Sequence, residues 1–280
     1  MNDATQDKLS EICSNSFRAL TDLELFIRVA MEGFVVGELA DEMHDLIRSS
    51  SLKAVRETAR EDSVWATETR KRLGEFSKKE KTRGFSFLFG LSSVRVWTIL
   101  EAMIGDYLVT LIENENDLLE RESIKKLKGP LIEFAAASRG QQAEYLSDLL
   151  IQDLKAKLKP GIGRFETILN EIGFGGGVNP HVARILLELS QLRNIILHKN
   201  GRVDARFVEF CPQKNVKTGE EILISENDFG LYYNASFWYV IEVFKRFISP
   251  SSISHIERFS GHQEGYLTRI DTILKKTTAT

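Results

Sequence analysis

A short polar run interrupts an apolar helical stretch of the 280-residue chain. Arg193 and Asn194 stand side by side, and His198 follows Asn194 by four residues, which places that pair on one helix face. Arg193 is five residues from His198, about 140° around an ideal helix. Histidine exchanges protons near neutral pH, and a guanidinium can bind two phosphoryl oxygens at once. These residue types suit metal-free RNA cleavage, in which the 2′-hydroxyl attacks the phosphate with help from a base and an acid.

Charged residues near this run extend the same hypothesis. Lys199 and Arg202 add positive charge that could contact the RNA backbone. Glu101 and Asp106 lie on an earlier apolar helical stretch, where they either anchor the arginine or histidine or belong to a solvated face, and both readings stay open. One histidine per chain leaves either the base or the acid unfilled. A two-fold dimer would bring two such histidines to one site, so we expect a homodimer.

The elements that would position these residues are predicted to be helices, because apolar residues recur every three or four positions. Asn179-Pro180 starts the helix that carries the polar run, Gly201 stops it, and Asp204 is expected to cap a short helix that follows. The ranges predicted to be helical are 9–30, 34–47, 61–83, 91–113, 118–136, 140–158, 164–172, 180–200, 205–210, 225–248 and 253–275. One strand is predicted, at 221–224. The fold class is therefore all-α: a helical bundle with a small β-hairpin or single-strand excursion near 217–224.

Composition narrows the function classes. The chain has 37 basic and 40 acidic residues, a formal charge of −3, with 42% hydrophobic and 28% charged residues. That mix is typical of a soluble globular protein and argues against nucleic-acid or membrane binding by bulk charge. Two distant cysteines and five scattered histidines give no disulfide scaffold and no zinc spacing, so neither a metal nor a cofactor is expected. The sequence lacks the loops of NAD enzymes and P-loop NTPases and the nucleophile elbow of α/β-hydrolases.

The chain is predicted to fall into two parts and to be cytoplasmic. Residues 1–83 form an N-terminal helical region of unknown role, and residues 84–280 a helical domain that includes the C-terminal helix. The N-terminus is polar, and no apolar run reaches the roughly 20 residues of a membrane span, so no membrane association is expected. Between Arg70 and Arg83, seven basic residues stand against two acidic ones. That strip is either a solvated helix face or linker, or a secondary RNA contact.

The motif Leu-Arg-Asn-(x3)-His-(x2)-Gly-(x2)-Asp, from Leu192 to Asp204, resembles that of the HEPN superfamily of helical ribonuclease-like domains. The helical segments around Glu101 and before Gly173 resemble two earlier helices of that family. The resemblance covers about residues 84–247, and residues 1–83 share none of it.

The resemblance implies a metal-independent endoribonuclease that acts as a two-fold dimer, in a toxin–antitoxin or antiviral-defence role. It implies Arg193, Asn194 and His198 as catalytic residues, RNA as substrate, and a cognate antitoxin or defence-system protein as partner. The alternative is a non-catalytic module of the same fold, used for dimerisation or for binding a nucleotide or partner. A third reading is an unrelated helical scaffold whose Arg/His pair is accidental.

Overall fold

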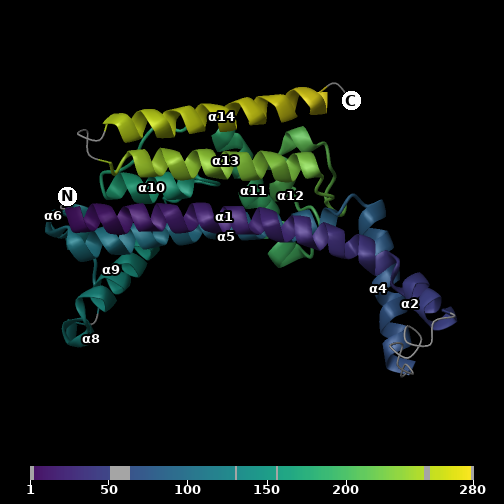
Figure 1. Ribbon diagram of the computed structural model, residues 1–280. Helices are drawn as coiled ribbons and strands as arrows, with labels where there is room; N and C mark the ends of the chain where they lie inside the picture. The colour runs from purple at the N-terminus through teal and green to yellow at the C-terminus, as the bar shows by residue number, and fades with distance from the viewer. Residues whose placement is uncertain (1–2, 51–63, 130, 156, 249–252, 279–280) are drawn as a thin grey trace. The chain divides into compact units, whose positions relative to one another are not determined.

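The computed structural model describes residues 3–50, 64–129, 131–155, 157–248 and 253–278, and every regular element among them is a helix (Figure 1). The all-α prediction is confirmed. The elements are α1 (Asp3–Glu38), α2 (Ala40–Ser49), α4 (Val64–Thr82), α5 (Ser86–Asn114), α6 (Asn116–Leu119), α7 (Glu122–Lys125), α8 (Leu131–Ala136), α9 (Arg139–Leu154), α10 (Gly163–Glu171), α11 (Pro180–Lys199), α12 (Ala205–Phe210), the 3₁₀ helix η1 (Pro212–Lys214), α13 (Glu226–Lys245) and α14 (Ile253–Thr278). The predicted helix at 61–83 begins outside the described residues, since 61–63 are not among them.

The strand predicted at 221–224 is wrong: the segment forms no strand. Glu221 makes one isolated antiparallel bridge with Arg202, and the Val203 N–H donates a 2.9 Å hydrogen bond to the Glu220 carbonyl. The partner segment lies between the end of α11 at residue 199 and the start of α12 at residue 205. It is too short to extend the pairing, so the β excursion is reduced to this bridge.

The structure divides into two compact units, each described here by itself. Unit 1 contains the described residues of 1–21, 93–222 and 230–280, and unit 2 those of 22–92 and 223–229. These units cut the chain at places other than the predicted boundary between residues 83 and 84. Residues 3–21 of α1 belong to unit 1 because their apolar side is buried there: Leu9 and Cys13 are at most 2% exposed, and the Phe17 and Phe237 rings lie 5.4 Å apart.

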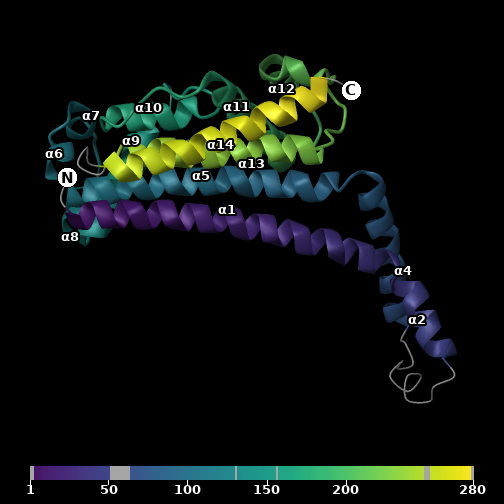
Figure 2. The ribbon, with the colours of Figure 1, turned by 45° about the horizontal axis from the view of Figure 1, so that its top comes forward.

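The core of unit 1 is built on α5. Leu100, Tyr107 and Leu111 are fully buried, and the apolar sides of α11 and α13 are buried as well. The α13 and α14 helices run side by side in both views, joined by the stacked rings of Phe237 and Tyr266 (Figures 1 and 2). Among the described residues α5 is the one helix long and apolar enough to cross a membrane, and 61% of its most apolar window is buried within the protein.

Unit 2 is held together by aromatic contacts between the second part of α1, α4 and the start of α5. The Phe34 ring lies 5.8 Å from the rings of both Phe76 and Phe85, and α2 packs on α4. The Ile224 N–H donates a 2.7 Å hydrogen bond to Ser86 Oγ, which fixes the segment before α13 to the first turn of α5.

Candidate functional site

The α11 helix positions the predicted polar run, and its two ends form as the sequence predicts. Asn179 Oδ1 accepts hydrogen bonds from the backbone N–H groups of His181 (2.9 Å) and Val182 (3.4 Å), and Pro180 is the first helical residue. Asn200 and Gly201 end the helix in left-handed conformations, with φ of 52° and 73°. Capping at both ends fixes where α11 begins and ends, and the burial of its apolar side in the core of unit 1 sets its rotation.

Arg193 is half-buried, and its guanidinium is held by a carboxylate of α5. Its Nη2 lies 3.5 Å from Glu101 Oε2, and its Nη1 donates a 3.2 Å hydrogen bond to Asn194 Oδ1. Arg164 of α10 donates a 3.3 Å hydrogen bond to the other oxygen of the same carboxylate. The Nε of Arg193 is buried and has no hydrogen-bond partner among the described residues. Of the two readings of Glu101, the structure therefore supports the anchor.

These side chains line a cavity of about 190 Å³ whose walls are mainly polar and basic. Its ionisable lining residues are Lys159, Arg164, Arg193 and Arg206 against the single Glu101, a formal charge of +3. The remaining lining residues are Trp97, Leu158, Pro160, Gly161, Ser190, Gln191 and Asn194. A small cavity with this excess of positive charge is suited to an oxyanion such as a phosphate group.

Sequence reasoning missed three of the four cations of this cavity. Arg164 comes from α10, Arg206 from α12 and Lys159 from the loop before α10, so the chain fold alone brings them to α11. Gly161 allows that loop to approach, because its φ is +63° and a Cβ there would lie only 2.7 Å from the Leu187 Cα of α11. The Pro-Gly break at 160–161 was the available sequence signal.

His198 does not line the cavity. It is exposed in the last turn of α11, one turn beyond Asn194, and its ring makes no hydrogen bond or ion pair with the described residues. Five residues of helix separate it from Arg193 by about 7.5 Å along the axis. Within one chain, then, Arg193 and Asn194 are together at the cavity and His198 points to solvent.

Asp106, the second predicted acidic residue, also lies outside the cavity beside Arg193. Asp106 lies five residues beyond Glu101 on α5 and lines a different cavity, of about 570 Å³, with Glu144 and Asp148 of α9. Partial burial there raises the pKa of the Asp106 carboxyl. Asp106 therefore anchors neither Arg193 nor the histidine.

Lys199 and Arg202 lie at the end of α11 beyond the cavity. Lys199 is exposed, and its amine makes no ion pair with the described residues. Arg202 donates a 3.1 Å hydrogen bond to the Gly219 carbonyl, so it also holds the turn that carries the β bridge. The basic strip of α4 is exposed in large part, although Glu80 within it is buried and accepts a 3.1 Å hydrogen bond from the Phe87 N–H.

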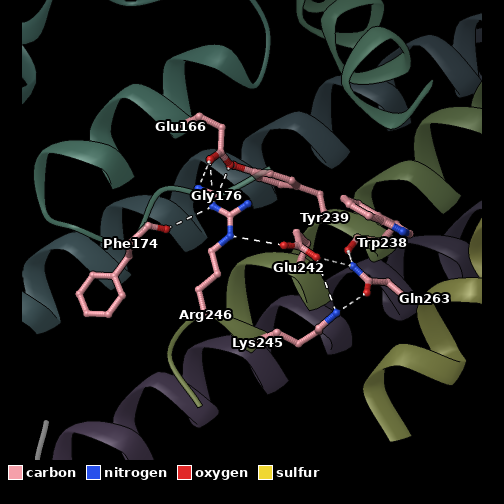
Figure 3. Close-up of polar contacts among 9 residues, drawn as sticks. All are labelled: Glu166, Phe174, Gly176, Trp238, Tyr239, Glu242, Lys245, Arg246 and Gln263. Atoms are coloured by element: carbon pink, nitrogen blue, oxygen red, sulfur yellow. Dashed lines mark hydrogen bonds and ion pairs between the residues drawn. The ribbon is translucent and has the colours of Figure 1, made fainter. Parts of the chain in front are cut away.

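A second polar cluster, also missed at the sequence level, is buried between α10 and α13 (Figure 3). Glu166 accepts hydrogen bonds from Arg246 Nη1 (2.9 Å), the Tyr239 hydroxyl (2.7 Å) and the Gly176 N–H (3.2 Å). Arg246 Nε lies 3.5 Å from Glu242, whose carboxylate accepts a bond from Gln263 of α14. Burial, followed by the carboxylate of Glu166, raises the pKa of Tyr239 well above its usual range. Because its charges are paired with one another, this cluster serves to hold α10 and α13 together.

Within the described residues, no three His, Cys, Asp or Glu side chains gather to hold a metal ion. Both cysteines are free and buried. Comparison of the whole chain with protein-family models, with curated proteins and with solved structures finds no match. The site is therefore interpreted from its own geometry.

Proposed function

We propose that this protein is a metal-independent endoribonuclease, with the cavity beside Arg193 as the site that binds the scissile phosphate. The supporting observation is the placement of Arg193: its guanidinium is held at the wall of a cavity of formal charge +3, with its Nε unpaired. Cleavage through the 2′-hydroxyl builds negative charge on the phosphoryl oxygens, and fixed guanidinium groups stabilise that charge. Asn194 accepts a hydrogen bond from Arg193, and in this proposal it orients the phosphate.

His198 supplies the proton transfer in this proposal. Because the ring is exposed and outside the cavity of its own chain, the mechanism requires either a second copy that brings its His198 to the phosphate or a shift of the last turn of α11. A two-fold dimer provides two histidines, one as the base that takes the 2′-hydroxyl proton and one as the acid that protonates the leaving oxygen. The proposal therefore includes a homodimer.

The direct experiment is cleavage of a mixed-sequence RNA by purified protein in EDTA. We expect products with 2′,3′-cyclic phosphate ends from the native protein and none from His198→Ala or Arg193→Ala. His262→Ala is the matched control, because His262 is also an exposed histidine but lies on α14 and lines none of the cavities described above. Equal cleavage by the native and His198→Ala proteins would remove the histidine from the mechanism.

The resemblance to HEPN domains extends the proposal to the cell: a cytoplasmic nuclease of a toxin–antitoxin or antiviral-defence system, restrained by a cognate partner. Expression of the native chain should then slow growth, and His198→Ala should relieve the effect. Slowing of growth by both chains alike would argue that any toxicity is unrelated to RNA cleavage.

A second candidate is a non-catalytic module that binds a nucleotide or RNA end at the same cavity. Two observations favour it. His198 lies outside the cavity, and one nitrogen of the Arg193 guanidinium is already paired with the carboxylate of Glu101. This function predicts saturable binding of a fluorescent oligoribonucleotide with no cleavage, weakened in Arg193→Met and Arg164→Met and unchanged in His198→Ala. Dependence of the same RNA's turnover on His198 would rule it out.

A further inference from the structure

The second part of α1 and the whole of α2 carry an apolar stripe that no part of the described structure covers. Its positions are separated by alternating steps of four and three residues, the heptad spacing of a coiled-coil seam. The stripe, called the α1–α2 stripe below, consists of Leu25, Val29, Glu32, Val36, Leu39, Met43 and Leu46. Its six apolar side chains are between 42% and 73% exposed.

The stripe is distinct from the buried side of the same part of α1. That inner side consists of Leu23, Ile27 and Phe34, of which the first two are at most 8% exposed and the third contacts Phe76 of α4. Inner and outer positions are offset by two residues, about 200° around the helix. In this segment α1 therefore has two apolar faces, one buried and one exposed.

The register of the stripe continues through the junction between the two helices. The Leu39 N–H donates a 3.1 Å hydrogen bond to the Val36 carbonyl, and the Leu39 carbonyl accepts a 2.9 Å bond from the Met43 N–H. The chain thus passes from α1 to α2 through one tighter turn at Leu39, where α2 leaves the line of α1 (Figures 1 and 2), and the seam positions keep their spacing along the sequence over about three heptads.

We propose that the α1–α2 stripe is the seam of a parallel, two-stranded coiled coil with a second copy of this chain. The order of steps places Val29, Val36 and Met43 at position a and Leu25, Leu39 and Leu46 at position d. β-branched residues at a combined with leucine at d favour two parallel strands over higher oligomers. The inference goes beyond the proposed function and stands without it, because it concerns how two copies pair and rests on unit 2 alone.

The area of the stripe matches what such a pair needs. Phe26 and Val35, at the flanking e and g positions, are also exposed, by 58% and 38%. Together these eight apolar side chains present roughly 400 Å² of surface, taking roughly 90 Å² for a fully exposed side chain. A standard interface buries about 800 Å² on each partner, a little over half of it apolar. The exposed apolar area of these eight side chains is therefore close to the apolar part of such an interface.

Glu32 is the single charged residue of the seam, at position d. In a parallel pair it faces its own copy, so two like charges meet in a partly desolvated setting. One polar residue at a seam fixes register and oligomeric state at a cost in affinity. The proposal therefore predicts that Glu32→Leu tightens the pair.

The experiment is sedimentation equilibrium of the full chain, with circular dichroism to confirm that each variant keeps its helices. We expect a monomer–dimer equilibrium, with Val36→Lys/Leu46→Lys weakened by about 100-fold and Glu32→Leu tightened by about 10-fold. Asp45→Lys is the control: its side chain is 86% exposed, but it lies at position c, off the seam. Wild-type affinity of Asp45→Lys supports the assignment to the seam.

Strand direction is tested separately by Leu39→Cys under mild oxidation. A parallel pair brings the two residues at position 39 within disulfide reach, whereas the native cysteines are buried. A cross-linked dimer supports the proposal. A wild-type monomer at 50 µM, a dimer insensitive to both lysines, or an intact dimer without the cross-link would overturn it. None of these measurements uses RNA, so failure of the nuclease proposal leaves this one unaffected. A strict monomer would count against the homodimer of both proposals, whereas a dimer insensitive to both lysines, or one without the cross-link, would overturn this proposal alone.

Discussion

Replacing Arg246 by methionine tests the role of the buried polar cluster most sharply. The Arg246 side chain is 10% exposed and that of Glu166 14% exposed, so the change would leave Glu166 buried without its cation. Glu166 would keep only its hydrogen bonds from Tyr239 and Gly176. Removing one partner of a buried ion pair typically costs about 3–5 kcal/mol of the free energy of unfolding. We expect a loss in that range for Arg246→Met.

The double variant Arg246→Met/Glu166→Gln should recover much of this loss, because it removes both charges together. The assay is urea denaturation followed by far-UV circular dichroism, run as a double-mutant cycle with both single variants. Arg72→Met is the matched control: its pair with Glu68 is 2.6 Å long but exposed, and its loss should cost about 0.3–0.5 kcal/mol. A loss below 1 kcal/mol for Arg246→Met, or simple additivity of the two single variants, would refute the reasoning.

Three further predictions concern stability elsewhere. Burial raises the pKa of Cys13 and of Cys211 from 9.0 to about 12, so the unfolded chain loses these protons first and stability falls as pH rises above 9. The fall is on the order of 1 kcal/mol per thiol by pH 10. A double alanine variant should lose the larger part of this slope in urea titrations at pH 8 and 10, and the rest comes from Tyr107 and Tyr239, whose pKa values burial also raises. Gly161→Ala should lower the free energy of unfolding more than Gly201→Ala does. Both glycines have positive φ, but only a Cβ at 161 meets the α11 backbone, 2.7 Å from the Leu187 Cα. Equal losses in urea denaturation would mean that the loop shifts freely. Asp204→Ala removes the 2.8 Å cap of α12 and should cost about 1 kcal/mol, most of it restored in Asp204→Asn; an unrestored loss would show that the cap is not the cause.

Most of the helices, and the ends that carry caps, were predictable from local chemistry. The single helix predicted at 118–136 is wrong, because the structure has the short helices α6, α7 and α8 there, and the helix predicted to end at residue 30 runs to Glu38. Asn179, Pro180 and Asp204 cap helices in the structure as their residue types suggest, because capping needs only neighbouring backbone groups. The short strand was not predictable, since a strand depends on a partner. The segment at residues 201–204 is confined between the end of α11 and the start of α12, so it is too short for more than one bridge.

The candidate site was predictable in part. Arg193 and Asn194 were found because a polar pair inside an apolar run requires a cleft or a partner. To choose between Glu101 and Asp106, one must know which side of α5 faces the site. The sequence does not give this, because α5 is apolar over most of its surface. Lys159 and Arg206 come from elements that only the tertiary fold brings to α11, so no local pattern could indicate them.

The two units share helices, and this limits how the protein can be truncated. Residues 3–21 of α1 belong to unit 1 and the rest of the helix to unit 2, and α5 is divided in the same way after Ser92. A fragment that starts at residue 84 would lose Leu9, Cys13 and Leu20, all nearly fully buried, and would expose the side of the core they cover. Fragments cut at that boundary should therefore aggregate, so a fragment intended to contain unit 1 must keep the first part of α1.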